Sequence, residues 1–412
     1  MQALLAPLKE LAEFGQMQEN LRKLISPIAL TGCVDSQKLH MMYGLSDGCK
    51  YTVIVTYSDL KAKELYEEYK FYDRNVMLYP AKDLIFFQAD IHGNQLTRER
   101  ICTLRRLIER KPTTIITTFA ALMAPQVLWD EEKDVILVER GGNINETYLA
   151  QKLVSMGYEK TYQVENPGQF SIRGGIVDVY DLTEENPYRI ELWGDEVDSI
   201  RSFDILSQRS IEKLESITIY PATEFVMEVD RVHAGLTKLK QEADRQSELF
   251  RKHFQTEEAH RVEQNFRELQ EQLLEFQSKV NIESYIRYFY DDPVTLPELM
   301  QNISGGKGLT FFIDEPGRVK EQADAVELEF RESMQQRAEK GYILPGQMNI
   351  LFNGEQVASK LMHGNVVTLS IMDGKSAYFK SAKKYDINVR NVAPYNNSFE
   401  ALVKDLKQYR KK

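Results

Sequence analysis

Apolar and polar residues alternate along two separate parts of the chain in the manner of an α/β fold. In residues 1–125, short apolar runs are separated by longer helical patterns, and the same order returns in residues 302–390. Parallel strands need crossover helices, so this order predicts one largely parallel sheet flanked by helices. The predicted strands are Ile28–Thr31, Thr52–Thr56, Val76–Tyr79, Thr113–Thr117, Leu309–Ile313, Asn349–Phe352 and Val366–Ser370.

Two segments of different pattern interrupt this sheet domain. Residues 126–222 contain short β-type runs separated by turn residues, and they predict a small β-rich α+β module. Residues 223–301 carry apolar residues at helical spacing among many charged ones, and they predict a helical insertion. Residues 391–412 predict a helix that no strand follows, which we interpret as the start of a following domain or linker. The clearest β-type runs of the module are Ile176–Tyr180, Tyr188–Trp193 and Ser199–Phe203.

Composition and charge narrow the functional class. The chain has 412 residues, 42% of them hydrophobic and 28% charged, as expected for a globular protein of several domains. Its formal net charge of −10 argues against autonomous nucleic-acid binding. Met1–Glu19 predict one amphipathic helix without the features of a signal peptide, and no apolar run is long enough for a membrane span. We therefore expect a cytoplasmic protein with no membrane contact.

The segment from Gly32 to Leu39 stands where a nucleotide-binding α/β protein carries its phosphate loop, Gly-x-x-x-x-Gly-Lys-Ser/Thr. Gly32 and Lys38 occupy their positions in that motif, but Gln37 replaces the second glycine and Leu39 replaces the hydroxyl residue. The glycine lets the backbone wrap a phosphate, and the hydroxyl binds magnesium. The sequence therefore predicts a degenerate site that merely joins strand to helix; an active nucleotide site is the alternative.

An apolar strand that ends in Asp314 and Glu315 is the second nucleotide-type feature. In ATPases, acids at this place orient magnesium and activate water. Without the glycine and hydroxyl of the first loop they have no metal–phosphate complex to act on. We expect them instead to cap the helix that begins near Gly317. His253 and His260 lack the spacing of a zinc pair, so the sequence predicts no catalytic residue, cofactor or metal in this part of the protein.

The run Tyr188–Trp193 offers a candidate docking surface. Alternate residues of a strand share a face, so Arg189 and Trp193 lie on the side opposite Ile190. Tryptophan and arginine often dominate the energetics of protein interfaces. A solvated arginine beside a half-buried tryptophan is the alternative, which the residues taken alone favour.

The same stretch resembles the small β-rich module of the UvrB family and of the bacterial transcription-repair coupling factors. The resemblance rests on an Arg-Gly before a strand, then Pro-Tyr-Arg and an aromatic residue, and on the segments that follow. Coupling factors also carry a degenerate first loop, whereas UvrB proteins carry an intact one. The chain is therefore identified as a member of the coupling-factor family, covering its N-terminal UvrB-like region with a RecA-like sheet. The matching positions are Arg173, Gly174, Pro187, Tyr188, Arg189, Trp193, Asp195–Asp204 and Tyr220–Phe225.

The resemblance implies a role in transcription-coupled nucleotide excision repair. The module would bind the repair protein UvrA through Arg173, Arg189 and Trp193, and this part of the protein would be non-catalytic. Other domains of the family bind RNA polymerase and form an ATP- and magnesium-dependent motor on double-stranded DNA. The alternative is half of a UvrB-like ATPase or helicase with an active nucleotide site. Against it, Tyr79–Gln95 is too short for the long β-hairpin that UvrB inserts into DNA.

Overall fold

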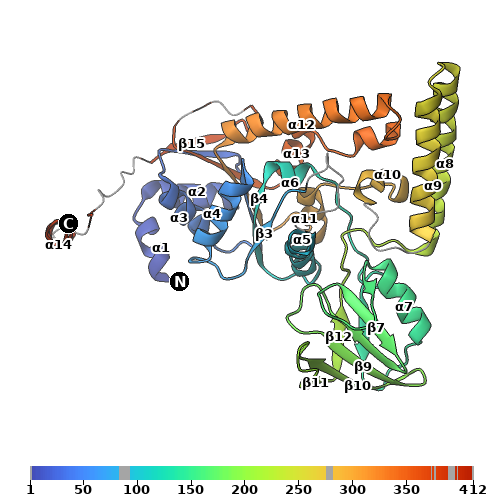
Figure 1. Ribbon diagram of the computed structural model, residues 1–412. Helices are drawn as coiled ribbons and strands as arrows, with labels where there is room; N and C mark the ends of the chain where they lie inside the picture. The colour runs from blue at the N-terminus through green and yellow to red at the C-terminus, as the bar shows by residue number, and fades with distance from the viewer. Residues whose placement is uncertain are drawn as a thin grey trace.

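The computed structural model describes residues 2–82, 93–274, 282–372, 374, 377–387, 395–396 and 398–410, and its largest unit is a seven-stranded sheet (Figure 1). Every pair of neighbouring strands in this sheet is parallel. Strands from the end of the chain lie among strands from its start, which confirms one sheet domain with two insertions. In order across the sheet the strands are β15 (Lys383–Asp386), β1 (Ile28–Thr31), β14 (Asn365–Ser370), β13 (Leu309–Asp314), β2 (Tyr51–Thr56), β4 (Thr113–Thr118) and β3 (Val76–Tyr79).

Helices cover both faces of the large sheet, which is why the central strands β13, β2 and β4 are buried along their whole length. On one face the core includes Leu39 and Leu65, and on the other it includes Ile101 and Val319. The helices of the first face are α1 (Gln2–Lys9), α2 (Ala12–Arg22), α3 (Asp35–Leu45) and α4 (Asp59–Tyr69). Those of the second face are α5 (Gly93–Ile108), α6 (Phe119–Met123), α11 (Leu296–Ser304), α12 (Pro316–Glu339) and α13 (Gly354–Leu361).

Two elements of the sheet domain differ from prediction. The single helix expected over Met1–Glu19 is two helices, because the chain turns at Leu11, whose N–H donates to the Leu8 carbonyl. The strand expected at Asn349–Phe352 is wrong. A 3₁₀ turn, η2 (Pro345–Asn349), leads into it, and Phe352 donates one backbone hydrogen bond to Met123 without joining a ladder. A short apolar run does not by itself distinguish a strand from a buried turn.

The β-rich module forms a six-stranded sheet that is antiparallel except for its last pair. Its inner face buries Phe170, Val177, Ile190 and Ile200, which belong to the same apolar core as one face of the large sheet. The predicted strands correspond to β8, β9 and β10. In order the strands are β11 (Ser210–Leu214), β10 (Glu196–Phe203), β9 (Tyr188–Trp193), β8 (Ile176–Val179), β7 (Gln169–Arg173) and β6 (Glu159–Lys160), beside α7 (Glu146–Ser155) and the pair β5 (Ile136–Glu139) and β12 (Ser216–Ile219).

The helical insertion is an antiparallel hairpin of two long helices, α8 (Val229–Lys252) and α9 (Thr256–Leu274), which projects from the rest of the molecule (Figure 1). The short elements η1 (Ile282–Tyr285) and α10 (Ile286–Phe289) return the chain towards the large sheet. Within the described ranges, no group of three or more His, Cys, Asp or Glu side chains could hold a metal ion.

At the end of the chain, α14 (Phe399–Tyr409) begins where the sequence predicts, because the Ser398 hydroxyl accepts from the Ala401 N–H at 3.3 Å. Most of the connection Tyr79–Gln95 that the sequence compares with the UvrB hairpin lies outside the described residues, at 83–92. Among the helices that the structure describes, none has the length and apolar character needed to cross a membrane.

Candidate functional site

The segment that corresponds to a phosphate loop is too short to form one. Strand β1 ends at Thr31 and α3 already begins at Asp35, so only Gly32–Val34 connect them. Gln37, which stands in place of the second motif glycine, lies in the first turn of α3. A phosphate loop needs a wider turn whose backbone N–H groups point towards the nucleotide. In this chain the motif residues from Asp35 onward, including Gln37, belong to α3 and do not form such a turn.

Gly32 has a structural reason to be glycine. Its φ is +80°, and a Cβ atom there would lie 2.3 Å from the Ile387 carbonyl oxygen. The Ile387 N–H donates to the Thr31 carbonyl at 2.9 Å, which places the chain after β15 directly over the loop. The carboxylate of Asp386 lies beside the same glycine. Gly32 therefore serves close backbone packing at the place where a phosphate would have to enter.

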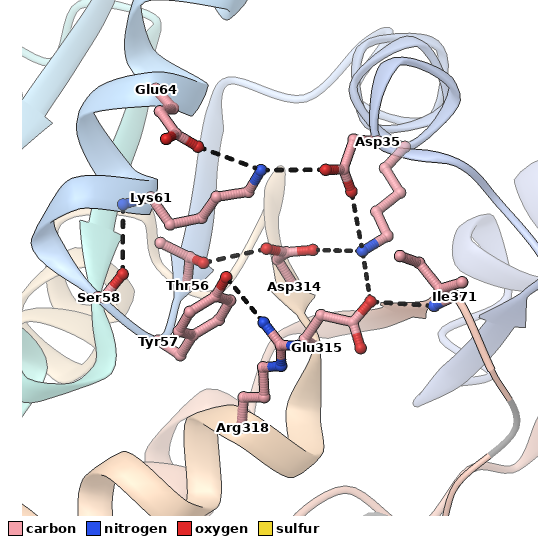
Figure 2. A network of polar contacts seen from close by, with 11 residues as sticks. Asp35, Thr56, Tyr57, Ser58, Lys61, Glu64, Asp314, Glu315, Arg318 and Ile371 are labelled. Atoms are coloured by element: carbon pink, nitrogen blue, oxygen red, sulfur yellow. Dashed lines mark hydrogen bonds and ion pairs between the residues drawn. The ribbon is translucent and has the colours of Figure 1, made fainter. Parts of the chain in front are cut away.

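Lys38 is buried and binds two carboxylates of its own chain. Its Nζ atom lies 2.8 Å from Asp314 Oδ1 and 2.6 Å from Glu315 Oε1, at the end of β13 (Figure 2). The Lys38 side chain is 3% exposed and that of Asp314 is 1% exposed. Asp35 adds a weaker contact at 3.6 Å. Burial opposes the charged form of Lys38, but Asp314 and Glu315 outweigh it and raise the pKa of the amine.

The two acids at the end of β13 are likewise fully engaged within the protein. Asp314 Oδ2 accepts a hydrogen bond from the Thr56 hydroxyl at 3.0 Å, and Glu315 Oε1 accepts one from the Ile371 N–H at 3.0 Å (Figure 2). The expectation that these acids cap α12 is wrong. Glu315 stands at the N-cap position but makes no side-chain capping bond, and its φ of +52° directs the carboxylate to Lys38 instead.

The remaining motif position is occupied by an apolar side chain. Leu39 is 2% exposed and packs in the apolar core on that face of the sheet, so it supplies no hydroxyl for magnesium. Burial raises the pKa of the Cys33 thiol, next to Gly32 in the loop, to about 11, which keeps it protonated at neutral pH.

The loop is bordered by more carboxylates than amines, and this balance disfavours a triphosphate. The carboxylates are Asp35, Asp314, Glu315 and Asp386, and the amines are Lys38 and Lys61.

On the outer face of the module, Arg189 is held by a buried acid. Its Nε and Nη2 atoms lie 2.6 and 2.8 Å from the two oxygens of Asp178, on the neighbouring strand β8. Nη2 also donates to Gln208 at 2.8 Å, and the guanidinium lies 4.3 Å from the ring centroid of Phe203. The Arg189 side chain is 13% exposed. Arg189 therefore joins strands β8 and β9 beneath the surface, and little of its side chain is exposed for contact with a partner.

Arg173 and Trp193 face solvent on the same side of the sheet. Trp193 is 83% exposed, and the Arg173 side chain is 39% exposed. Arg173 lies 3.3 Å from the Asp178 carboxylate that Arg189 already occupies, so most of its donors stay available. The exposed ring of Tyr162 lies 5.7 Å from the Arg173 guanidinium. These three side chains form an open aromatic and cationic surface, which we call the outer face.

Sequence reasoning missed Asp178 and Tyr162. Asp178 carried a usable signal, because it lies in a predicted strand at a position that shares a face with Arg173 and Arg189 once the antiparallel register is known. Tyr162 lies in the loop between β6 and β7 and carried no comparable signal. The three residues predicted to bind a partner therefore differ in exposure. Arg173 and Trp193 are exposed, whereas Arg189 is mostly buried and joins neighbouring strands.

Substitution Lys38→Met should destabilise the fold by about 3–5 kcal/mol, because it leaves Asp314 charged and buried beside a second acid. The raised pKa of Lys38 means that this stabilisation is fully present below its ordinary pKa of 10.5 and is lost only at higher pH. Urea denaturation followed by circular dichroism measures the loss. Lys61→Met, whose partners Asp35 and Glu64 are 53% and 52% exposed, is the matched control and should cost less than about 1 kcal/mol. Equal losses for the two variants would contradict the assignment.

Substitution Arg189→Ala should destabilise the module by about 3 kcal/mol, because it removes the main partner of buried Asp178. Both tryptophans of the chain, Trp129 and Trp193, lie in the module, so tryptophan fluorescence during urea unfolding reports on it. Arg201→Ala breaks a half-exposed pair with Glu191 and should cost at most about 1 kcal/mol. A loss no greater for Arg189→Ala than for Arg201→Ala would mean that Asp178 does not depend on Arg189.

The β-rich module matches a known protein family. Residues 136–225 match the family model of the UvrB interaction domain. The chain is 34% identical over 286 residues to the transcription-repair-coupling factor of Bacillus subtilis (strain 168), a match that covers 66% of this chain and 22% of that protein.

Two further relatives cover a similar share of the chain. The transcription-repair-coupling factor of Staphylococcus epidermidis is 30% identical over 282 residues, which is 67% of this chain and 23% of that protein. The UvrABC system protein B of Acinetobacter baylyi is 29% identical over 301 residues, which is 66% of this chain and 44% of that protein. The matches thus span less than half the length of each relative. The chain contains a UvrB interaction domain and is similar, along about two thirds of its length, to transcription-repair-coupling factors and UvrB proteins.

Proposed function

We propose that this chain is the UvrA-recruiting, non-catalytic part of a transcription-repair coupling factor acting in nucleotide excision repair. The observation that carries the proposal is the coincidence of two findings on one module. Residues 136–225 match the UvrB interaction domain, and the same residues present Arg173 and Trp193 on an open face that nothing else in the described chain covers.

The outer face has the chemistry of a protein docking site. An exposed tryptophan loses a large apolar area to a partner when it becomes buried, and a neighbouring arginine can donate to acidic groups of that partner. Arg189 and Asp178 join two of the strands beneath this face, so the backbone that carries its side chains is fixed before binding. Preorganisation of this kind reduces the entropy lost on association. The outer face therefore suits a protein with an apolar pocket bordered by carboxylates, and UvrA is the proposed partner.

The loop between β1 and α3 supports the non-catalytic half of the proposal. A bound ATP–magnesium complex would need the position that Lys38, Asp314 and Glu315 fill with one another. Under this proposal ATP hydrolysis, RNA polymerase binding and movement on double-stranded DNA belong to other parts of the whole protein, and the chain itself is a cytoplasmic adaptor. The rival function, half of a UvrB-like ATPase or helicase, requires the same loop to open.

Substitution Trp193→Ala should weaken UvrA binding by about 2 kcal/mol or more, about 30-fold in Kd, because truncation of a central aromatic anchor costs this much. Arg173→Ala should weaken binding in the same direction. Isothermal titration calorimetry of the chain with purified UvrA measures both. Because Trp193 is exposed, the variant keeps its fold, and circular dichroism checks this.

The matched control for that titration is Tyr148→Ala, which removes a 60% exposed aromatic side chain from α7 of the same module. It should bind like the unaltered chain. Unchanged affinity for the double variant Arg173→Ala/Trp193→Ala would refute the outer face as the UvrA site.

Thermal unfolding of the chain should be the same with and without ATP–magnesium, because Lys38, Asp314 and Glu315 are paired with one another and Leu39 supplies no hydroxyl for the metal. A nucleotide at about 100 times its Kd would stabilise the folded state by about 2.7 kcal/mol, which differential scanning fluorimetry detects easily. ADP–magnesium serves as a second nucleotide probe. A reproducible rise in Tm that Lys38→Met abolishes would instead support the ATPase alternative.

A further inference from the structure

Three parts of the chain meet at a buried cluster of four charged residues, which we call the junction quartet. Lys82 follows β3 of the large sheet, and Arg100 lies in α5. Glu224 stands where the chain leaves the module for the helical insertion, and Glu283 lies in η1 of that insertion. The site described above uses none of these residues.

Arg100 and Glu224 form the centre of the junction quartet. Arg100 Nε lies 2.7 Å from Glu224 Oε1, and Nη2 lies 2.8 Å from Oε2, so the pair is bidentate. Arg100 is 0% exposed and Glu224 is 2% exposed. Lys82 Nζ lies 2.6 Å from Glu224 Oε1 and also pairs with Glu283. Burial opposes the charged carboxylate, but Arg100 and Lys82 outweigh it and hold the pKa of Glu224 well below its usual range.

The backbone around the junction quartet is bound to the same side chains. Arg100 Nη1 donates to the Pro80 carbonyl at 2.7 Å, and its guanidinium lies 4.0 Å from the ring centroid of Tyr79. From the module side, the indole N–H of Trp129 donates to the Glu224 carbonyl at 3.0 Å. The end of β3, helix α5 and the module are therefore joined through two residues.

The charges of the junction quartet balance, with two cations and two carboxylates. Buried ions are tolerated only when they are paired in good geometry, and the loss of one partner leaves an uncompensated charge in a dry site. Movement of the module away from α5 would separate Glu224 from Arg100 and expose both to that cost. A bidentate pair has one favourable geometry, so it defines an orientation as well as a contact.

We propose that the junction quartet is an orientation latch, which fixes the β-rich module against the large sheet and the helical insertion and so gives the outer face one direction. Arg100 and Glu224 are its positioning residues. A second contact on the same helix supports it, because Arg105 Nη1 lies 2.6 Å from Glu184 of the module. Only the consequence for docking depends on the proposed UvrA function; the orientation itself is measured on the chain without any partner.

The test measures the distance between the two units by electron spin resonance. Spin labels are attached through Lys63→Cys on α4 and Glu212→Cys on β11, both at exposed positions. The background carries Cys49→Ser and Cys102→Ser, while the buried Cys33 is retained. The unaltered junction should give one narrow distance distribution. Glu224→Gln, which leaves an excess positive charge, should broaden or shift it.

A double variant separates charge balance from bidentate geometry. The combination Arg100→Met/Glu224→Gln leaves Lys82 and Glu283 as a neutral pair, so it should be more stable than Glu224→Gln alone. Its distribution should still be broad or shifted, because the bidentate pair that defines the orientation is gone. Glu191→Gln alters a pair that lies wholly within the module and should change nothing. A purely structural role would destabilise the chain without moving the label distance, so circular dichroism and label distance are measured together.

Lys82→Met, at a less buried member of the junction quartet, gives a second measurement if Glu224→Gln does not fold. The distribution of label distances should broaden in Lys82→Met too, because the junction quartet then carries an excess negative charge. Two outcomes would overturn the latch: an unchanged distribution in a folded Glu224→Gln or Lys82→Met variant, or a distribution in Arg100→Met/Glu224→Gln that is as narrow as that of the unaltered junction. The first would show that other contacts set the orientation. The second would show that packing, rather than the Arg100–Glu224 pair, sets it.

Discussion

A lysine amine buried between two carboxylates joins two distant segments of the large sheet. Lys38 and Asp314 come from segments 276 residues apart, and their contact ties α3 to the end of β13. Once out of water, each of these charges depends on the other, since neither can be solvated in place. The residues that would hold a nucleotide in a related fold therefore hold one another here. This contact gives the large sheet a fixed link between the segment after β1 and the end of β13.

The same physical rule recurs inside the β-rich module and at its junction with the large sheet. Arg189 is buried against Asp178 beneath the outer face, and Arg100 is buried against Glu224 at the junction. In each case a carboxylate with almost no exposure is neutralised by a cation from another strand or helix. Desolvation offsets much of the attraction within such a pair, but the loss of one partner leaves an uncompensated buried charge. The side chains left in water, Trp193 and Arg173, are the ones free to meet a partner.

Local signals in the sequence located most elements well. Strands with long apolar runs, such as β2 and β13, are where the pattern placed them, since both faces of a parallel sheet are covered. The helix after Asn145 begins there because the asparagine side chain accepts from the Tyr148 N–H. The strand predicted at Asn349–Phe352 is wrong because its apolar run is short. Apolar residues in a short segment satisfy a strand, a turn or a helix end equally well, and only neighbours far along the chain decide between them.

The sequence by itself determined that the nucleotide motif is incomplete, because Gln37 replaces a glycine whose backbone freedom the loop requires and Leu39 lacks the hydroxyl that binds magnesium. It also placed Arg189 and Trp193 on one side of a strand, since the alternation of side chains is a local property. Only the tertiary structure decided what each of them does. Arg189 and Asp178 are 11 residues apart, and Lys38 and Glu315 are 277 apart, so their pairing depends on strand register and on the order of strands in the sheet. Burial and pairing are properties of three-dimensional neighbours, and a linear pattern does not contain them.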